Sequence, residues 1–150
     1  MIIEKTRYVD LGILFNDPGH SRRVGVVDVL YDRGYFGIGV SMCAPQDTFD
    51  KEEGKEIARE RAESRLINNP LLLKDIEKMI LTWDKKYAAE ITQCDYFTRH
   101  DDLKETDGFD IRCACEKTVE LAWRDMLYTL ALSKSKADIS KDLIGDGVPF

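Results

Sequence analysis

Three arginines and a lysine on one predicted helix are the residues best suited to chemistry in this chain. Lys55 and Arg59 lie four residues apart, as do Arg61 and Arg65, and residues four apart share a face of a helix. Two cations on one face can hold a phosphate, so Arg59, Arg61 and Arg65 are candidate ligand-binding residues. The alternative is a solvated face of ion pairs, because glutamates interleave with the cations. These are Glu56, Glu60 and Glu63.

The strand predicted just before this helix carries glycine at alternate positions. Side chains of a strand alternate between two faces, so Gly37 and Gly39 leave one face nearly bare. Glycine weakens a strand interior, which indicates the close approach of a helix, another backbone or a ligand. Tight helix packing is the commoner reason. If a ligand approaches, Gly37 and Gly39 give it room, and Tyr35 and Phe36, or Phe97, offer a stacking surface for a base.

Cysteine and histidine raise the question of a metal site. Three thiolates and one imidazole suit tetrahedral zinc. The candidates are Cys94, His100, Cys113 and Cys115. Cys113 and Cys115 form C-x-C, whereas common zinc sites use C-x-x-C, and buried structural cysteine is the more usual role. We therefore predict no metal and no cofactor.

No catalytic signature accompanies these residues. The chain has no glycine-rich phosphate loop followed by lysine and no nucleophile elbow. Four aspartates lie near predicted strand ends, where a carboxylate pair can assist catalysis, but carboxylates at turns more often cap or stay solvated. They are Asp17, Asp28, Asp32 and Asp47. We accordingly expect a protein that is not an enzyme.

Composition and charge exclude several classes of protein. The chain has 150 residues, 43% of them hydrophobic, which suffices for one ordinary domain with a core. A total of 22 basic and 28 acidic residues gives a net charge of -6. This charge disfavours a nucleic-acid partner, because counterion release needs clustered cations. The sequence shows no apolar run long enough for a membrane span and no secretion signal, so we expect a cytoplasmic protein with reduced cysteines.

The elements that must position these residues form an α+β fold in a single domain over residues 1–150. Strand patterns over 9–15, 24–31 and 36–43 predict an antiparallel sheet of three to four strands across about 8–43. Asp50 and Glu53 have capping-box spacing, which starts a helix near Lys51. About three helices follow the sheet, at about 51–67, 71–92 and 113–134, and a flexible tail begins at about 135.

Two of these helices carry more apolar surface than a monomer needs. Apolar residues form a continuous stripe along 71–92, and along 113–134 they cover more than one stripe. The sheet can cover one stripe, and a second copy of the chain can cover the other. We therefore expect a homo-oligomer that assembles through 71–92 and 113–134.

The stretch from residue 41 to 65 resembles small accessory proteins of bacteriophages. The residues that carry the resemblance are Ser41-x-Cys43-x-Pro45-x-Asp47-x-Phe49, then Gly54, Ile57-Ala58 and Arg61. Among such proteins the stretch is most similar to the sponge family that counters Thoeris immunity by holding a cyclic ADP-ribose signal. The resemblance implies a compact α+β subunit, dimers or larger oligomers, nucleotide pockets near subunit boundaries, and a location in the cytoplasm of the bacterial host.

Residues and resemblance together predict a non-catalytic protein that binds and sequesters a small cyclic nucleotide of host immunity. Such a protein needs cations for phosphate, an aromatic face for a base and closely approaching backbone, and it needs no nucleophile. Two other functions stay open. An acidic, oligomeric inhibitor could bind a host defence protein such as a nuclease complex, with the stretch from Asp101 to Asp110 imitating a phosphate backbone. A hydrolase with a hidden carboxylate or metal site would return the nucleotide altered.

Overall fold

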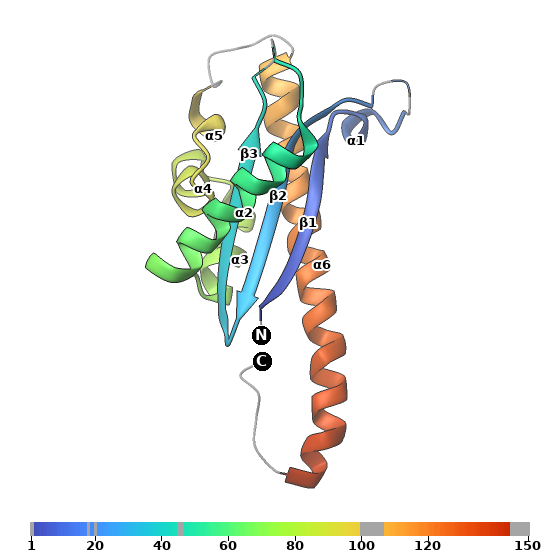
Figure 1. Ribbon diagram of the computed structural model, residues 1–150, viewed down its shortest axis with the longest axis vertical. Coiled ribbons are helices and arrows are strands. Elements are labelled where there is room, and N and C mark those ends of the chain that lie inside the picture. Colours follow the sequence, from blue (N-terminus) through green and yellow to red (C-terminus); the bar gives the residue numbers. More distant parts are fainter. Residues whose placement is uncertain (1, 18, 20, 45–46, 100–106, 145–150) are drawn as a thin grey trace.

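A three-stranded antiparallel sheet lies between two helices in the computed structural model (Figure 1). Its strands are β1 (Ile3–Asp10), β2 (Arg23–Asp32) and β3 (Tyr35–Met42), in that spatial order. One face is covered by α2 (Lys51–Asn68) and the other by α6 (Asp107–Ile144). The remaining helices are α1 (Gly12–Phe15), α3 (Leu73–Thr82), α4 (Lys85–Thr92) and α5 (Tyr96–Arg99). The predicted α+β fold is confirmed.

The structure describes residues 2–17, 19, 21–44, 47–99 and 107–144, with the backbone alone at 99, 107–109 and 134–144. Residues 100–106 of the predicted connection and 145–150 of the predicted tail lie outside this range. Within it, no helix combines the length and the apolar character that crossing a bilayer requires.

β1 lies earlier in the chain than the alternating pattern predicted. Residues 12–15, which were predicted to continue a strand, form the short helix α1 instead. Asp10 ends the strand because its Oδ1 accepts hydrogen bonds from the backbone N–H of Gly12 (2.8 Å) and of Arg22 (3.1 Å). The strand prediction over 9–15 was wrong because this local side-chain acceptor turns the chain before the apolar pattern ends.

The β2–β3 hairpin agrees with its sequence prediction. Arg33 (φ 50°) and Gly34 (φ 90°) form the turn, both in the left-handed region that suits a two-residue hairpin connection. Asp28 lies opposite Gly39 in the register. Because side chains alternate, both positions belong to the face that α2 covers.

α2 begins where the capping signal placed it. Asp50 accepts hydrogen bonds from the backbone N–H of Glu52 (3.0 Å) and of Glu53 (3.1 Å). Ala58 and Ala62 are fully buried, since they are the residues that face the sheet. The small side chains let the helix axis lie close to β3.

The predicted helix over 71–92 is in fact the two helices α3 and α4. Trp83 ends α3 in a left-handed conformation (φ 43°), and Asp84 caps α4 by accepting from the backbone N–H of Tyr87 at 2.9 Å. The apolar stripe crosses this break unchanged, so its period could not reveal one residue with positive φ.

α6 is longer at both ends than the predicted 113–134 helix. Its backbone stays helical to Ile144, where a flexible tail was predicted from about 135. The buried face of α6 packs on the sheet, with the Trp123 and Phe36 ring centroids 4.8 Å apart. The C-terminal part extends well past the sheet (Figure 1).

Candidate functional site

A groove between β1 and α2 brings three cations and an aromatic ring together. Lys51, Lys55 and Arg59 follow one another in steps of four residues, so they occupy one face of α2. The Tyr8 ring on β1 lies across from them, with Lys51 Nζ 5.5 Å from its centroid. The groove has a volume of about 670 Å³, within the range of small-ligand sites. It is lined by Glu4, Tyr8, Lys51, Glu52, Lys55, Glu56, Arg59 and Glu63.

The cations of the groove differ in how they are paired. Arg59 Nη1 lies 2.8 Å from Glu4 Oε1, and its Nε donates to Glu63 Oε1 at 2.5 Å. The hydrogen bond to Glu63 and, to a smaller extent, the one to Glu4 raise the pKa of Arg59. Lys51 and Lys55 are exposed and form no ion pair with any residue that the structure describes. An anion can therefore reach the two lysines without breaking an ion pair.

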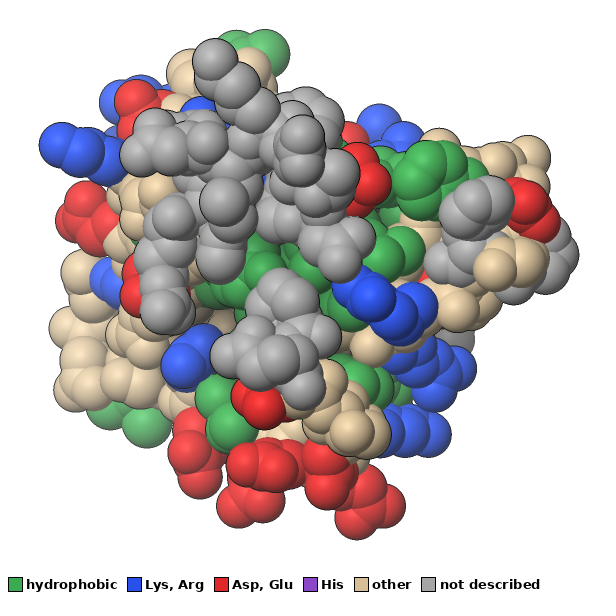
Figure 2. Space-filling view, turned by 90° about the horizontal axis from the view of Figure 1, so that it is seen from above, with side chains coloured by type: hydrophobic (Ala, Val, Ile, Leu, Met, Phe, Trp, Pro, Cys, Tyr) green, Lys and Arg blue, Asp and Glu red, His purple; other side chains and the backbone are tan. Residues whose placement is uncertain are grey.

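The surface around the groove has mixed charge. In the view from above, acidic side chains gather along one edge of the molecule, with lysine and arginine side chains beside them (Figure 2). On α2, Glu52 and Glu56 are exposed, like Lys51 and Lys55, which they directly follow in the sequence. A ligand of this groove therefore meets both hydrogen-bond acceptors and cations.

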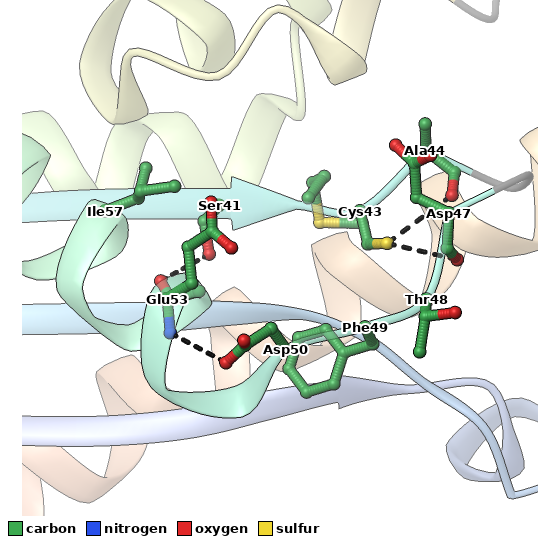
Figure 3. Close-up of a pocket in the computed structure, with 11 residues that line it drawn as sticks. Ser41, Cys43, Ala44, Asp47, Thr48, Phe49, Asp50, Glu53 and Ile57 are labelled. Carbon is green, nitrogen blue, oxygen red and sulfur yellow. Dashed lines mark hydrogen bonds between the residues drawn. The ribbon is translucent and has the colours of Figure 1, made fainter.

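A second cavity, of about 420 Å³, lies at the start of α2 (Figure 3). Its lining includes Ser41, whose Oγ donates to the Gly54 carbonyl at 2.6 Å, and Cys43, whose Sγ lies 3.5 Å from the Asp47 carbonyl. Several residues of the phage-protein resemblance thus meet here. They are Ser41, Cys43, Asp47, Phe49, Gly54 and Ile57.

The charge of this second cavity disfavours a phosphate. Its charged lining residues are Asp47, Asp50 and Glu53, all carboxylates. Like charges repel an anion, and the Asp50 carboxylate already accepts from the first amides of the helix. The groove between β1 and α2 is therefore the better candidate for an anionic ligand.

The three predicted arginines do not converge on one site. Arg59 lines the groove, whereas Arg61 Nη1 donates to the Val40 carbonyl at 2.5 Å. Arg65 is buried and donates to the Glu90 carbonyl, in the last turn of α4. Arg59 and Arg61 are two residues apart, about 200° around the helix, so they point to different neighbours. Arg61 and Arg65 hold α2 to β3 and α4.

The predicted glycines and two of the predicted aromatic residues are packed inside the protein. A Cβ added at Gly37 would lie 2.2 Å from the Ala62 carbonyl oxygen, and one at Gly39 would lie 2.1 Å from that of Ala58. The room in front of both glycines is therefore filled by α2, which corrects their interpretation as space for a ligand. Phe36 is fully buried on the opposite face of the sheet, and the same burial keeps Phe97 from stacking on a ligand.

Tyr35 is the remaining predicted residue. It is 47% exposed, at the hairpin end of β3. β3 runs opposite to α2, since Ser41 near the end of β3 lies beside Gly54 at the start of the helix, and Gly37 lies beside Leu66 near its end. Tyr35, at the start of β3, therefore lies toward the C-terminal end of α2. The structure does not bring Tyr35 to the groove that Arg59 lines.

A pair of carboxyl groups lies behind the groove. Asp28 is fully buried beneath α2, and its Oδ1 accepts from Thr6 Oγ1 at 2.7 Å. Glu4 lies beside it on the same face of the neighbouring strand and reaches Arg59 with its Oε1. Burial is the main cause that raises the pKa of Asp28 to about 8, and the neighbouring Glu4 is the second. The neighbouring Asp28 carboxyl group and, after it, Arg59 lower the pKa of Glu4.

Cys94 and Cys115 are buried in the core, whereas Cys43 and Cys113 are half-buried. Burial raises the pKa of the Cys115 thiol well above its ordinary value, and the nearby Cys94 adds to this. Burial also raises the pKa of Cys43 and of Cys113. Protonated thiols are poor nucleophiles and poor metal ligands. Across the described residues, no group of three or more His, Cys, Asp or Glu is placed to hold a metal, and His100 lies outside them.

Sequence reasoning missed Tyr8, Lys51 and the Asp28–Glu4 pair. Lys51 had a readable signal, since it extends the Lys55–Arg59 spacing by one step. Asp28 had one too, because it is a carboxylate inside a run of β-branched residues. Glu4 and Tyr8 had none, since β1 was predicted to begin after them.

Comparison with known proteins identified no relative of this chain. No family model matches the chain, and neither a curated protein nor a solved structure is similar to it.

Proposed function

We propose that this protein binds a small nucleotide in the groove between β1 and α2 and thereby sequesters a cyclic nucleotide signal in the cytoplasm of a bacterial host. The observation that carries the proposal is the row of Lys51, Lys55 and Arg59 along a groove that Tyr8 also lines. A protein that only holds its ligand needs such groups and no nucleophile.

Each part of a nucleotide has a counterpart in the groove. The phosphate lies between the ammonium groups of Lys51 and Lys55, which no carboxylate of the described residues neutralises by direct contact. The base stacks on Tyr8, whose ring already attracts the Lys51 ammonium. Glu52 or Glu56 accepts hydrogen bonds from ribose hydroxyls, as carboxylates do in dinucleotide sites.

The acidic residues of the groove favour a nucleotide over a bare phosphate. The lining has three cations and four carboxylates, so a multiply charged inorganic anion gains little net attraction. A ligand with one phosphodiester charge and several hydroxyl donors uses both kinds of group. We therefore propose a cyclic nucleotide, with a single charge per phosphate, as the ligand class.

The proposal includes self-association. Tyr128 and Leu132 lie four apart on α6 and are 68% and 49% exposed, an apolar face that the described residues leave uncovered. A second copy of the chain would bury it, in agreement with the apolar excess along the predicted 113–134 helix.

Isothermal titration of the full chain tests the proposed ligand class. Cyclic AMP and cyclic ADP-ribose are titrated against it, with inorganic phosphate as comparison. We expect at least one cyclic nucleotide to bind, tighter than phosphate by about tenfold or more. Chromatography of ligand released by heat should return it unaltered, whereas an altered nucleotide would indicate a hydrolase.

Two lysine pairs make a matched comparison. The double variant Lys51→Ala/Lys55→Ala should weaken nucleotide binding at least tenfold, because it removes both unpaired cations. Lys74 and Lys78 are likewise exposed and four apart, on α3, so Lys74→Ala/Lys78→Ala changes net charge equally and should leave binding unchanged. If both double variants weakened nucleotide binding equally, binding would depend on net charge and not on the groove. If the wild type bound none of the tested nucleotides but captured a host protein, the acidic inhibitor would be favoured instead.

A further inference from the structure

Asp28 and Glu4 lie on the same face of two adjacent strands, and their neighbouring carboxyl groups can share a proton. Asp28 Oδ2 and Glu4 Oε2 are both buried, and neither accepts a hydrogen bond from a donor among the described residues. Two ionised carboxylates would repel each other in such a place, whereas one proton between them satisfies both oxygens. The geometry therefore describes a carboxyl–carboxylate pair that carries one negative charge.

The neighbours of the pair decide which partner is ionised. From α2, Arg59 contacts Glu4 directly and Lys55 adds a second positive charge, while Glu63 faces the pair only through Arg59. From β1, Thr6 donates to Asp28. On this face β3 presents one titratable side chain, Tyr35, at its exposed hairpin end away from the pair. The other residues that it places there are Gly37, Gly39 and Ser41. Glu4 is thus ionised beside the cations, and Asp28 holds the proton.

We propose that the groove takes up its anionic ligand together with a proton, which the Asp28–Glu4 pair retains. This inference rests on the proposed function, since it concerns the same groove. An anion between Lys51 and Lys55 offsets the charge of Lys55, which together with Arg59 keeps Glu4 ionised. The pair then holds its proton more tightly, and by thermodynamic reciprocity the protonated pair holds the anion more tightly.

The coupling gives the affinity a defined dependence on pH. The free protein loses the shared proton as the pH rises through the titration of Asp28, whose pKa burial raises to about 8. Above that value the pair carries two negative charges at the edge of the groove and repels an anion. One coupled proton changes affinity by at most about tenfold per pH unit, so the loss between pH 7 and pH 9 should reach three- to tenfold.

The test uses the full chain and cyclic AMP, whose phosphodiester and adenine ring keep their charges between pH 7 and pH 9. Titration calorimetry at pH 7, 8 and 9, in two buffers of different ionisation enthalpy, measures affinity and proton uptake together. We expect net proton uptake near pH 8 in the wild type. Asp28→Asn should abolish it and flatten the pH profile, because an amide supplies the same donor and acceptor without titrating. Any contribution of the groove lysines is common to both proteins.

A second variant covers the case in which Asp28→Asn does not fold. Glu4→Gln places a permanent donor opposite Asp28 Oδ2 and removes the Glu4 charge, so Asp28 should lose its proton at a lower pH and proton uptake near pH 8 should fall. Binding without proton uptake, with the same pH profile in wild type and variants, overturns the coupling and leaves the proposed function standing. Absence of binding of cyclic AMP and of cyclic ADP-ribose at every pH overturns both.

Discussion

Arg59, Arg61 and Arg65 lie on one helix and make three different contacts. Arg59 faces carboxylates at the groove, Arg61 a carbonyl of β3, and Arg65 a carbonyl near the end of α4. A cation near the carbonyl end of a helix is favourable for the helix dipole, and the stem of a buried arginine adds apolar contact. At the scale of the residue, the presence of three arginines indicates a phosphate-binding site. The direction in which each side chain points decides whether that site forms.

A buried carboxyl group with a raised pKa makes stability depend on pH. The folded chain keeps the Asp28 proton up to a pH of about 8, whereas in the unfolded chain Asp28 loses it near its ordinary pKa of 3.8. The free energy of unfolding should therefore fall as the pH rises between these two values. Between pH 6 and pH 8 this contribution is on the order of 2 kcal/mol.

Asp28→Asn should remove this dependence. Relative to wild type, the variant should gain stability from pH 6 to about pH 8 and little beyond, since its amide can hydrogen-bond Thr6 and Glu4 without a titrating proton. Urea unfolding followed by tryptophan fluorescence at pH 6, 7.5 and 9 measures the difference. A difference that is the same at all three values would show that Asp28 does not carry the proton.

At the scale of the element, α2 lies close to the sheet because β3 lacks side chains where the helix crosses. The carbonyl oxygens of Ala58 and Ala62 occupy the places that a Cβ of Gly39 and of Gly37 would take. This close approach puts Arg59 within reach of Glu4 on β1 and forms one wall of the groove. The glycines therefore serve the candidate site indirectly, by positioning α2.

Gly39→Ala should displace α2 from the sheet. Its methyl group would lie 2.1 Å from backbone, which side-chain rotation cannot relieve, so we expect a loss of about 3 kcal/mol in the free energy of unfolding. Urea unfolding with circular dichroism measures the loss. Glu60→Ala, on the exposed side of the same helix, is the control and should stay within about 0.5 kcal/mol of wild type. Equal stability of the two variants would contradict this packing.

At the scale of the whole molecule, α6 packs on the sheet along only part of its length. Its first part packs on β1 and β2, and its last part extends past the sheet (Figure 1). Arg7 on β1 pairs with Asp125, and the exposed Tyr128 follows within one turn. The apolar face thus continues beyond the point where the sheet can cover it.

Charges on this face should prevent self-association. We expect light scattering to show an oligomer for the wild type and a monomer for Tyr128→Lys/Leu132→Lys, because burying two ammonium groups in an apolar contact is unfavourable. Ile67→Lys changes an even more exposed apolar residue, at 76%, outside α6 and should leave the oligomer intact. A wild type that is monomeric at high concentration would remove self-association from the proposal.

The amino-acid sequence by itself determined the class of fold and the elements with strong local signals. The β2–β3 hairpin and the start of α2 follow from turn residues, strand alternation and a capping aspartate, all of which act within a few residues. The early end of β1 and the break at Trp83 escaped prediction, because single side-chain or backbone contacts override an apolar pattern that continues through them.

Only the tertiary structure decided which polar residues meet. Glu4, Asp28 and Arg59 come from three elements, and their contact depends on the strand register and on how closely α2 approaches the glycines of β3. Sequence periodicity assigns a residue to a face of its own element, but it does not say which other face will lie against it. For that reason the cations of α2 could be predicted from spacing, whereas their groove and the proton behind it could not.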